Sequence, residues 1–427
     1  MEASKLALLG GTPLSPAPPG PYPRFSQAAI ERITGLLQRG TTVGLNKNCP
    51  EIAEAEQAIA TWQGVPYCLG TSSGHAALHS ALIGLEVASG DEVITTPYTW
   101  GASISCILHN NAVPVFADVD PQTGLLDPAA IASQITPRTR AVLAVHIYGQ
   151  PADMTAIRAV ADRHGLAVIE DGSQAHGALH RGQKVGQFGD AAGFSCMGGK
   201  LLASSEAGYM VTPHEQVYWQ AAMAGQHMGR SPEAGFPDAL RPYVDSLVYT
   251  YRLNPLNAVL LTEQLTKIDA ENEARRVNVA TFRAAMEGVR SVSFPTYPEG
   301  DRPTYHMVTM NFDPEIAGVA RSTYMQALRA EGVPIFAYVP APIPQWSRLH
   351  WQDYDGPRVM WTETLRRSGI DYALADVPNC ERKVARSLEL SWNYVDVDEA
   401  NMNRLAAAFE KVEENLDALR AWEAQRR

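Results

Sequence analysis

The chain has 427 residues, of which 45% are hydrophobic and 19% charged, and its formal net charge is −11. This is the composition of a globular protein long enough for two domains. The acidic balance argues against nucleic-acid binding, because no basic run is present to neutralise phosphates, and no apolar stretch is long enough to span a bilayer.

The five cysteines are scattered, odd in number and without CxxC pairs. We therefore expect reduced thiols in a cytoplasmic protein, with neither a disulfide framework nor a metal site. The N-terminus is too short and too interrupted to be a secretory signal.

Residues 1–25 contain a proline-rich stretch, and proline fixes φ and removes an amide donor. We expect this segment to run extended over the surface. Residues 26–38 then predict a helix, with Ser26 as N-cap and apolar side chains on one face. A second helix is expected over about 50–63.

From residue 66 onward, short apolar strands alternate with helices. We expect strands at 67–69, 92–95, 113–117, 141–147, 166–169 and 192–196, and helices at 75–87, 101–108, 128–134, 154–163 and 256–268. This alternation predicts an α/β large domain over 26–270, with a mostly parallel sheet covered on both faces. Ligands of such sheets bind at the carboxyl ends of the strands.

After about residue 270 the pattern changes to that of a smaller α+β domain over 271–427. Strands are expected at 291–294, 307–312 and 333–338, and helices at 321–330 and 398–424, separated by a proline-containing loop at 340–356. Apolar residues in the last helix recur in steps of three and four, which indicates one buried stripe.

The run from Val168 to Lys200 places reactive side chains at strand ends. Asp171 follows one strand, Ser195 ends another, and Lys200 stands between two glycines and two leucines. Desolvation is the usual route to a lysine amine reactive enough to form a Schiff base. Pyridoxal phosphate (PLP) chemistry requires such an acid, hydroxyl and lysine. Taken alone, this stretch fits an ordinary α/β strand end equally well.

Two further features lie at expected strand ends. The turn GTSSGH (70–75) precedes a helix and offers free amide groups to a single phosphate, although a plain Gly/Ser turn explains it too. Trp100 could lie flat against an aromatic ring or belong to the core. His146 and His176 are also near this rim, and we assign neither a catalytic role.

Seven segments together resemble the DegT/DnrJ/StrS family of PLP-dependent sugar and cyclitol aminotransferases, within fold type I. They are GTSSGHAALHSAL (70–82), GDEVITTPYTWGAS (90–103), PVFADVDPQTGLLDP (114–128), VHIYGQPADM (145–154), IEDGSQAHGA (169–178), GDAAGFSCMGGKLLASSEAGYMVT (189–212) and YTYRLNPLNA (249–258). The resemblance runs from Leu6 to about Lys267. It implies a seven-stranded type of sheet and a homodimer with shared active sites.

The resemblance implies four roles around the cofactor ring. Lys200 would bind the cofactor aldehyde covalently and move a proton at the reacting carbon. Asp171 would pair with the pyridine nitrogen. Gln174 would contact the phenolic oxygen of the ring, and Trp100 would stack on it.

A second group of residues would hold the cofactor phosphate by the same resemblance. The turn at Ser73, Gly74 and His75 would offer backbone N–H groups, and Ser195 would add its hydroxyl. Thr250 would reach the phosphate from the partner subunit.

The sequence departs from the family pattern at several positions. His75 stands where threonine is usual, and Thr250 where asparagine is usual. The four residues from Cys196 to Gly199 are unusually small. Lys200 is retained, which argues against the dehydratases of the family. We expect the core chemistry of the family to be retained. Whether the substrate pocket follows the family pattern stays open.

Three functions stay open at this stage. The first is transfer of an amino group from glutamine or glutamate to a ketone on a cyclitol or nucleotide-linked sugar, in an aminoglycoside-like biosynthesis. The opening LALLGGTPL favours it, since it resembles the branch acting on inososes or making 3-amino-5-hydroxybenzoate, which commonly uses glutamine. The second is a PLP enzyme catalysing elimination, oxidation or cyclisation. The third is a PLP-binding regulator without turnover.

Overall fold

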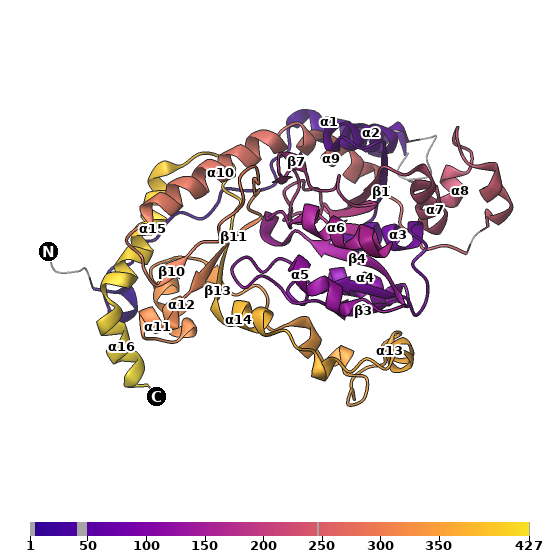
Figure 1. Ribbon diagram of the computed structural model, residues 1–427. Helices are drawn as coiled ribbons and strands as arrows, with labels where there is room; N and C mark the ends of the chain where they lie inside the picture. Colours follow the sequence, from indigo (N-terminus) through magenta and orange to yellow (C-terminus); the bar gives the residue numbers. More distant parts are fainter. Residues whose placement is uncertain (1–4, 41–48, 246, 427) are drawn as a thin grey trace.

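The computed structural model describes residues 5–40, 49–245 and 247–426. Residues 1–4 of the predicted proline-rich segment lie outside this range. The described chain forms a larger unit around a seven-stranded sheet and a smaller one around a four-stranded sheet, and both chain ends lie on the side of the smaller unit (Figure 1).

The large sheet has the strand order β1-β9-β8-β5-β4-β2-β3. Its strands are β1 (Tyr67–Thr71), β2 (Glu92–Thr95), β3 (Val113–Phe116), β4 (Thr139–Val145), β5 (Ala167–Asp171), β8 (Ala191–Ser195) and β9 (Gly208–Thr212). Five of them pair in parallel, and β9 runs antiparallel to both β1 and β8. The predicted α/β class with a mostly parallel sheet is confirmed.

Helices cover both faces of this sheet because successive strand residues point to opposite faces. Leu69 and Met210 belong to a core packed with α3 (Gly74–Gly84) and α7 (Glu215–Gly225) on one face. This cluster continues along the sheet to α4 (Ala102–His109) and α6 (Met154–His164). Their neighbours Cys68 and Val211 belong to the core on the opposite face, packed with α2 (Pro50–Gln63) and α9 (Pro255–Leu265).

The first helix, α1 (Gln27–Arg39), begins after Ser26, whose hydroxyl accepts a hydrogen bond from the Ala29 amide as predicted. Its expected apolar face is only partly covered, because Leu36 is buried while Ile30 and Leu37 are 51% and 56% exposed.

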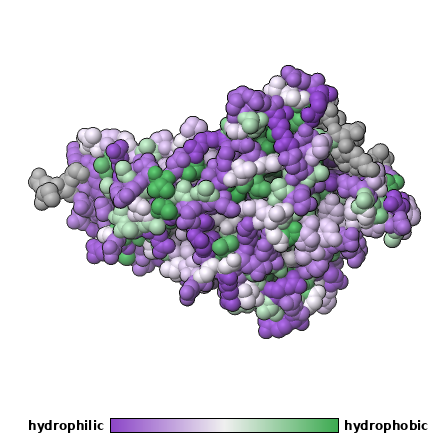
Figure 2. Space-filling view, turned by 90° about the horizontal axis from the view of Figure 1, so that it is seen from above, coloured by the Kyte–Doolittle hydropathy of each residue, from purple (hydrophilic) through white to green (hydrophobic). Residues whose placement is uncertain are grey.

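Seen from above, the surface of the molecule is mainly hydrophilic, with apolar side chains in separate patches (Figure 2).

The small sheet is antiparallel, in the order β10-β11-β13-β12, and packs against α10 (Ile268–Ala285), α12 (Arg321–Ala330) and α15 (Glu399–Glu414). Its strands are β10 (Val292–Ser293), β11 (Met307–Phe312), β12 (Ile335–Phe336) and β13 (Ser387–Ser391). The prediction of a single C-terminal helix over 398–424 is wrong. The helix is interrupted at Asn415, which separates α15 from α16 (Leu416–Ala424).

The N-terminal segment is tied to the small domain. Leu6 is fully buried in its core, next to a short 3-10 helix at Ala7–Leu9. The Ala7 amide donates to Glu331 at 2.7 Å, and the Ala17 amide donates to Asn401 at 2.7 Å. From there the segment crosses to α1 on the large domain (Figure 1).

Residues 343–372 return to the large domain, where Ile343, Leu349 and Trp361 pack against α4 and β3. In Figure 1 the segment around α13 (Thr362–Ser368) accordingly lies beside these elements. The boundary near residue 270 coincides with the start of α10 and stays a prediction. Among the described residues, no helix is both long and apolar enough to cross a membrane.

Candidate active site

A cavity of about 510 Å³ opens where the carboxyl ends of the large sheet face the small domain. Seven of the nine predicted site residues line it: Gly74, His75, Trp100, Asp171, Gln174, Ser195 and Lys200. Ser73 and Thr250 do not. The structure thus brings most of the predicted residues together around one cavity, and their roles stay predictions.

The Asp171 carboxylate is fixed at the end of β5. Its side chain accepts a hydrogen bond from the Ser103 hydroxyl at 2.6 Å and one from the Ser173 amide at 3.0 Å. The Thr99 hydroxyl lies 3.0 Å from that of Ser103 and extends the network. A buried carboxylate held in this way can pair with a protonated ring nitrogen. Ser103 was not predicted, although its place in the first turn of α4, four residues after Thr99, is a usable signal.

The environment of the Lys200 amine favours its neutral form more than that of a free lysine does. Burial lowers the pKa of Lys200 below that of a free lysine, and the nearby Asp171 carboxylate opposes this shift. The Lys200 amide donates to the Met197 carbonyl at 2.8 Å, which closes a turn over the two glycines. A neutral lysine amine is the nucleophile that an aldehyde cofactor requires.

Tyr22 holds the backbone of this lysine from the N-terminal segment. Its hydroxyl lies 3.0 Å from the Lys200 carbonyl oxygen and 2.6 Å from that of Leu201. The Arg275 guanidinium lies 5.3 Å from the Tyr22 ring centroid. Sequence reasoning missed Tyr22, because nothing local connects a tyrosine among prolines to a lysine 178 residues later.

We expect Tyr22→Phe to lower the free energy of unfolding by about 1–2 kcal/mol, because the Lys200 and Leu201 carbonyls lose the one partly buried hydroxyl donor that they share. The backbone of Lys200 should also loosen, so that the pH at which bound cofactor changes its absorbance shifts. Urea unfolding and a spectrophotometric pH titration measure the two effects. Tyr243→Phe, at an exposed tyrosine, is the matched control; equal behaviour of the two variants would contradict the prediction.

The turn before α3 has the donors that a phosphate needs. The Gly74 and His75 amides occupy the first turn of α3, and the described residues offer them no acceptor, nor any partner to the Ser195 hydroxyl. A Cβ at Gly74 would lie 2.5 Å from the Cβ of Ser195, so only glycine allows this approach. Ser73 instead caps the helix, accepting from the Ala76 amide at 3.1 Å. These free donors fit the cofactor phosphate.

The His75 side chain is directed to α4. One ring nitrogen lies 2.8 Å from His109 and the other 3.3 Å from the Ser105 hydroxyl. His79, one turn further along α3, lies 2.8 Å from the Tyr251 hydroxyl. Burial lowers the pKa of both His75 and His79 to about 4, and the proximity of the rings adds to the shift. Both imidazoles are therefore neutral at neutral pH.

This cluster predicts acid sensitivity. An unfolded histidine has a pKa near 6.5, so between pH 6.5 and 4 the unfolded state binds more protons and stability falls as pH falls. The fully buried His79 should account for up to about 3 kcal/mol of that loss. Urea unfolding at pH 7, 5.5 and 4 measures it, and His79→Gln should flatten the slope. An unchanged slope in that variant would contradict the prediction.

Trp100 and Gln174 meet a residue of the small domain. Trp100 is 59% exposed and thus not a core tryptophan, and its ring centroid lies 5.9 Å from that of Tyr338. The Gln174 side chain accepts from the Tyr148 amide at 2.7 Å and donates to the Tyr338 hydroxyl at 3.1 Å. Tyr338 was not predicted, because it follows β12 of the small domain and contacts the site only through the packing of the two domains.

Thr250 is exposed and lies outside the cavity. The next residues, Tyr251 and Arg252, pair with Ser72 and Thr71, which holds the segment beside the phosphate turn of its own subunit. The role of Thr250 toward a partner subunit stays a prediction.

The small residues before Lys200 have a packing explanation. Cys196 is fully buried, and its sulfur lies 3.9 Å from the His176 ring. Both residues thus face the core, and burial raises the pKa of the Cys196 thiol. His146, 3.0 Å from Glu170 and 3.0 Å from the Ala152 amide, is likewise structural.

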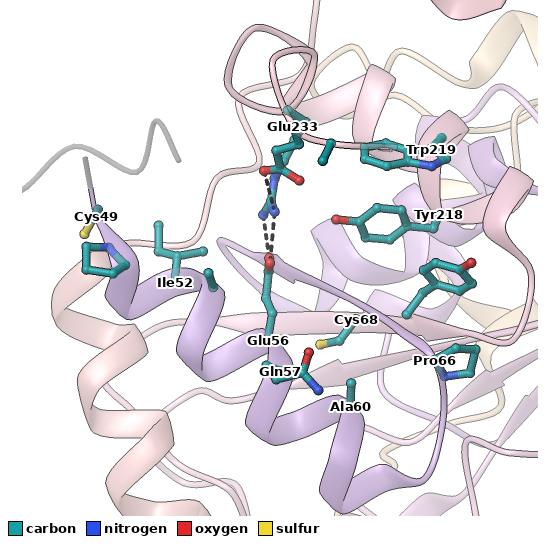
Figure 3. Close-up of a pocket in the computed structure, with 15 residues that line it drawn as sticks. Cys49, Ile52, Glu56, Gln57, Ala60, Pro66, Cys68, Tyr218, Trp219 and Glu233 are labelled. Atoms are coloured by element: carbon teal, nitrogen blue, oxygen red, sulfur yellow. Dashed lines mark hydrogen bonds and ion pairs between the residues drawn. The ribbon is translucent and has the colours of Figure 1, made fainter. Parts of the chain in front are cut away.

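A buried ion pair of Glu56 lies against Gly70, where the phosphate turn begins, and dashed lines mark the pair in Figure 3. The Glu56 carboxylate accepts from the Gly70 amide at 2.7 Å and from both terminal nitrogens of Arg230. Gln226 donates to the Gly70 carbonyl at 2.6 Å. The Gly70 peptide is thus held on both sides, which fixes the chain where it enters the turn.

The model of the DegT/DnrJ/EryC1/StrS aminotransferase family matches residues 26–370, most of the chain. The chain belongs to this family. It is a PLP-dependent aminotransferase with the fold predicted from its sequence, and the free donors around Gly74 and the fixed Asp171 carboxylate fit the cofactor.

Individual relatives cover nearly the whole chain. The L-glutamine:2-deoxy-scyllo-inosose aminotransferase of Streptoalloteichus tenebrarius is 36% identical, over 97% of this chain and 99% of the relative. The structure of an aminotransferase from Psychrobacter cryohalolentis is 26% identical, with a TM-score of 0.80 over 94% of this chain and 100% of that one. Bacillus subtilis NtdA with bound cofactor PMP, at 22% identity, shares the fold with a TM-score of 0.74 over 92% of this chain and 85% of that one.

Proposed function

We propose that this aminotransferase moves the amino group of L-glutamine to a ketone on a cyclitol ring, in an aminoglycoside-like biosynthesis. The observation that carries the proposal is the near full-length similarity to the inosose aminotransferase of Streptoalloteichus tenebrarius, whose name gives glutamine as donor. The resemblance of the opening residues to the inosose branch supports the same choice.

The charge of the cavity supports a neutral acceptor. Among the described residues lining it, Lys200 is the only lysine, and there is no arginine. A nucleotide-linked sugar carries a diphosphate, which proteins usually hold with arginine or lysine side chains. A cyclitol ketone has no such charge and needs only hydrogen bonds.

The chain's own residues divide the work of each half-reaction. When bound, PLP supplies the electron sink of the amino transfer. The Lys200 amine removes and returns the proton at the reacting carbon, and the Asp171 carboxylate keeps the ring nitrogen protonated. The Gly74 and His75 amides and the Ser195 hydroxyl anchor the phosphate, so that the reacting carbon stays within reach of Lys200.

We also propose a homodimer in which Thr250 contacts the partner's phosphate site. Large apolar side chains near this segment and on α1 remain uncovered in the single chain, as expected of a subunit interface. They are Ile30, Leu37, Tyr243, Leu247 and Tyr249. Analytical ultracentrifugation tests the dimer, and a monomer with full activity would overturn the shared site.

A two-step assay tests the function. The enzyme is mixed with glutamine alone, and loss of the bound-cofactor absorbance and release of the 2-oxo acid are followed. A polyhydroxylated cyclic ketone is then added, and the original spectrum should return. An enzyme of the family that catalyses elimination or cyclisation would release little 2-oxo acid, and a non-catalytic binder none. Glutamate and alanine serve as comparison donors.

A further inference from the structure

One wall of the cavity comes from the small domain, and none of its residues was predicted. His306 directly precedes β11, and Asn393 follows the end of β13 by two residues. These strands pair antiparallel, with Met307 opposite Ser391, so the two residues emerge side by side at one end of the small sheet. Tyr338 stands beside them at the cavity.

Two polar atoms on this wall lack partners. The Nδ1 atom of His306 and the Oδ1 atom of Asn393 are both buried and have no hydrogen-bond partner among the described residues. His306 is 9% exposed. A buried polar atom without a partner is costly, and native proteins retain few of them. Both atoms belong to residues that line the cavity, so a bound molecule can complete their hydrogen bonds.

The chemistry of the wall indicates what that molecule offers. Burial holds the pKa of His306 well below its usual range, and the nearby Lys200, Arg275 and His176 side chains add to this shift, so its ring is neutral. A neutral imidazole and an amide each combine donor and acceptor capacity. The Tyr338 hydroxyl accepts from Gln174 and keeps its own proton to donate. Such groups match hydroxyls, which both donate and accept, better than they match a carboxylate or a phosphate.

We propose that His306 and Asn393 form the specificity subsite for the acceptor, binding ring hydroxyls of a neutral polyol ketone. The proposal rests on the proposed function for the nature of the acceptor. It goes further by assigning recognition to two small-domain residues outside the cofactor-binding set. A site built to bind a hydroxyl rejects analogues that lack it, because its own polar atoms then stay unpaired.

The test separates the two half-reactions. In Asn393→Ala and His306→Phe, the rate constant with a polyhydroxylated cyclic ketone should fall about 10- to 100-fold, while the glutamine half-reaction should change less than about twofold. His306→Gln, which keeps hydrogen-bonding capacity, should recover part of the loss. Asn403→Ala, at an exposed asparagine outside the cavity, is the matched control.

A binding measurement independent of turnover completes the test. Inositol, an unreactive neutral polyol, is titrated by calorimetry into the cofactor-loaded wild type and each variant, and its affinity should fall by a similar factor. Absent inositol binding by the wild type, unchanged affinity in the variants, or an equal loss in both half-reactions would overturn the subsite. If the wild type binds inositol but no ketone restores its spectrum, the proposed function fails while the subsite stands.

Discussion

Lys200→Ala is expected to lower the rate of both half-reactions by about 10³-fold or more, because the variant has no amine to bond the cofactor or to move the proton. The phosphate donors at Gly74, His75 and Ser195 are untouched, so non-covalent cofactor binding should persist. Stopped-flow absorbance with glutamine, and separately with a ketone and the aminated cofactor, measures each half-reaction.

Circular dichroism checks that the Lys200→Ala variant is folded. Lys267→Ala is the matched control, since Lys267 lies outside the cavity and pairs with Glu263. It should leave both half-reactions unchanged. Turnover by Lys200→Ala near the rate of this control would refute the assignment of Lys200 as the catalytic base.

Arg230→Ala should produce the largest loss of stability, about 3–5 kcal/mol, because it leaves the Glu56 carboxylate buried without its cation. The side chains of Arg230 and Glu56 are only 7% and 9% exposed, so water cannot replace the missing charge readily. The Gly70 peptide should then move, and bound cofactor should dissociate faster. Urea unfolding and cofactor retention during dialysis measure the two effects.

A paired variant separates charge from packing at this site. In Glu56→Gln with Arg230→Met, no charge is buried, and the amide oxygen of the new glutamine can still accept from Gly70. Most of the lost stability should return, as expected when both partners of a buried pair are replaced. If the double variant is as unstable as Arg230→Ala, the loss comes from packing and the ion pair is unimportant. Arg241→Ala, at an exposed arginine, is the surface control.

The large domain was predictable because its signals are local. Short apolar strands, helix caps such as Ser26 and strand-end groups such as Asp171 all reveal themselves within a few residues. Several elements escaped, among them β9 and α7 of the large domain. In two others, buried polar residues interrupt the apolar pattern. Helix α10 buries Asn272 and Arg275, so its sequence lacks a continuous apolar stripe. Strand β13 buries Glu389, so its sequence lacks a continuous apolar run.

The same reasoning applies to the site. Residues carried by strand ends of the large domain, such as Lys200 and Gly74, could be placed from the sequence together with its family resemblance. Tyr338, His306 and Asn393 could not, because they reach the cavity only through the packing of one domain on the other. Charge networks behind the site, such as Glu56 with Arg230, likewise join segments 174 residues apart.

The path of the N-terminal segment has a consequence for the order of folding. Residues 7 and 17 bind residues 331 and 401, at separations of 324 and 384 residues, so the segment cannot dock until most of the chain has left the ribosome. Tyr22 lies between these attachments and α1, and it supplies the donor to the Lys200 carbonyl. The contact of Tyr22 with the Lys200 backbone is therefore expected to form among the last steps of folding, and a nascent chain that stalls before residue 401 is expected to lack it.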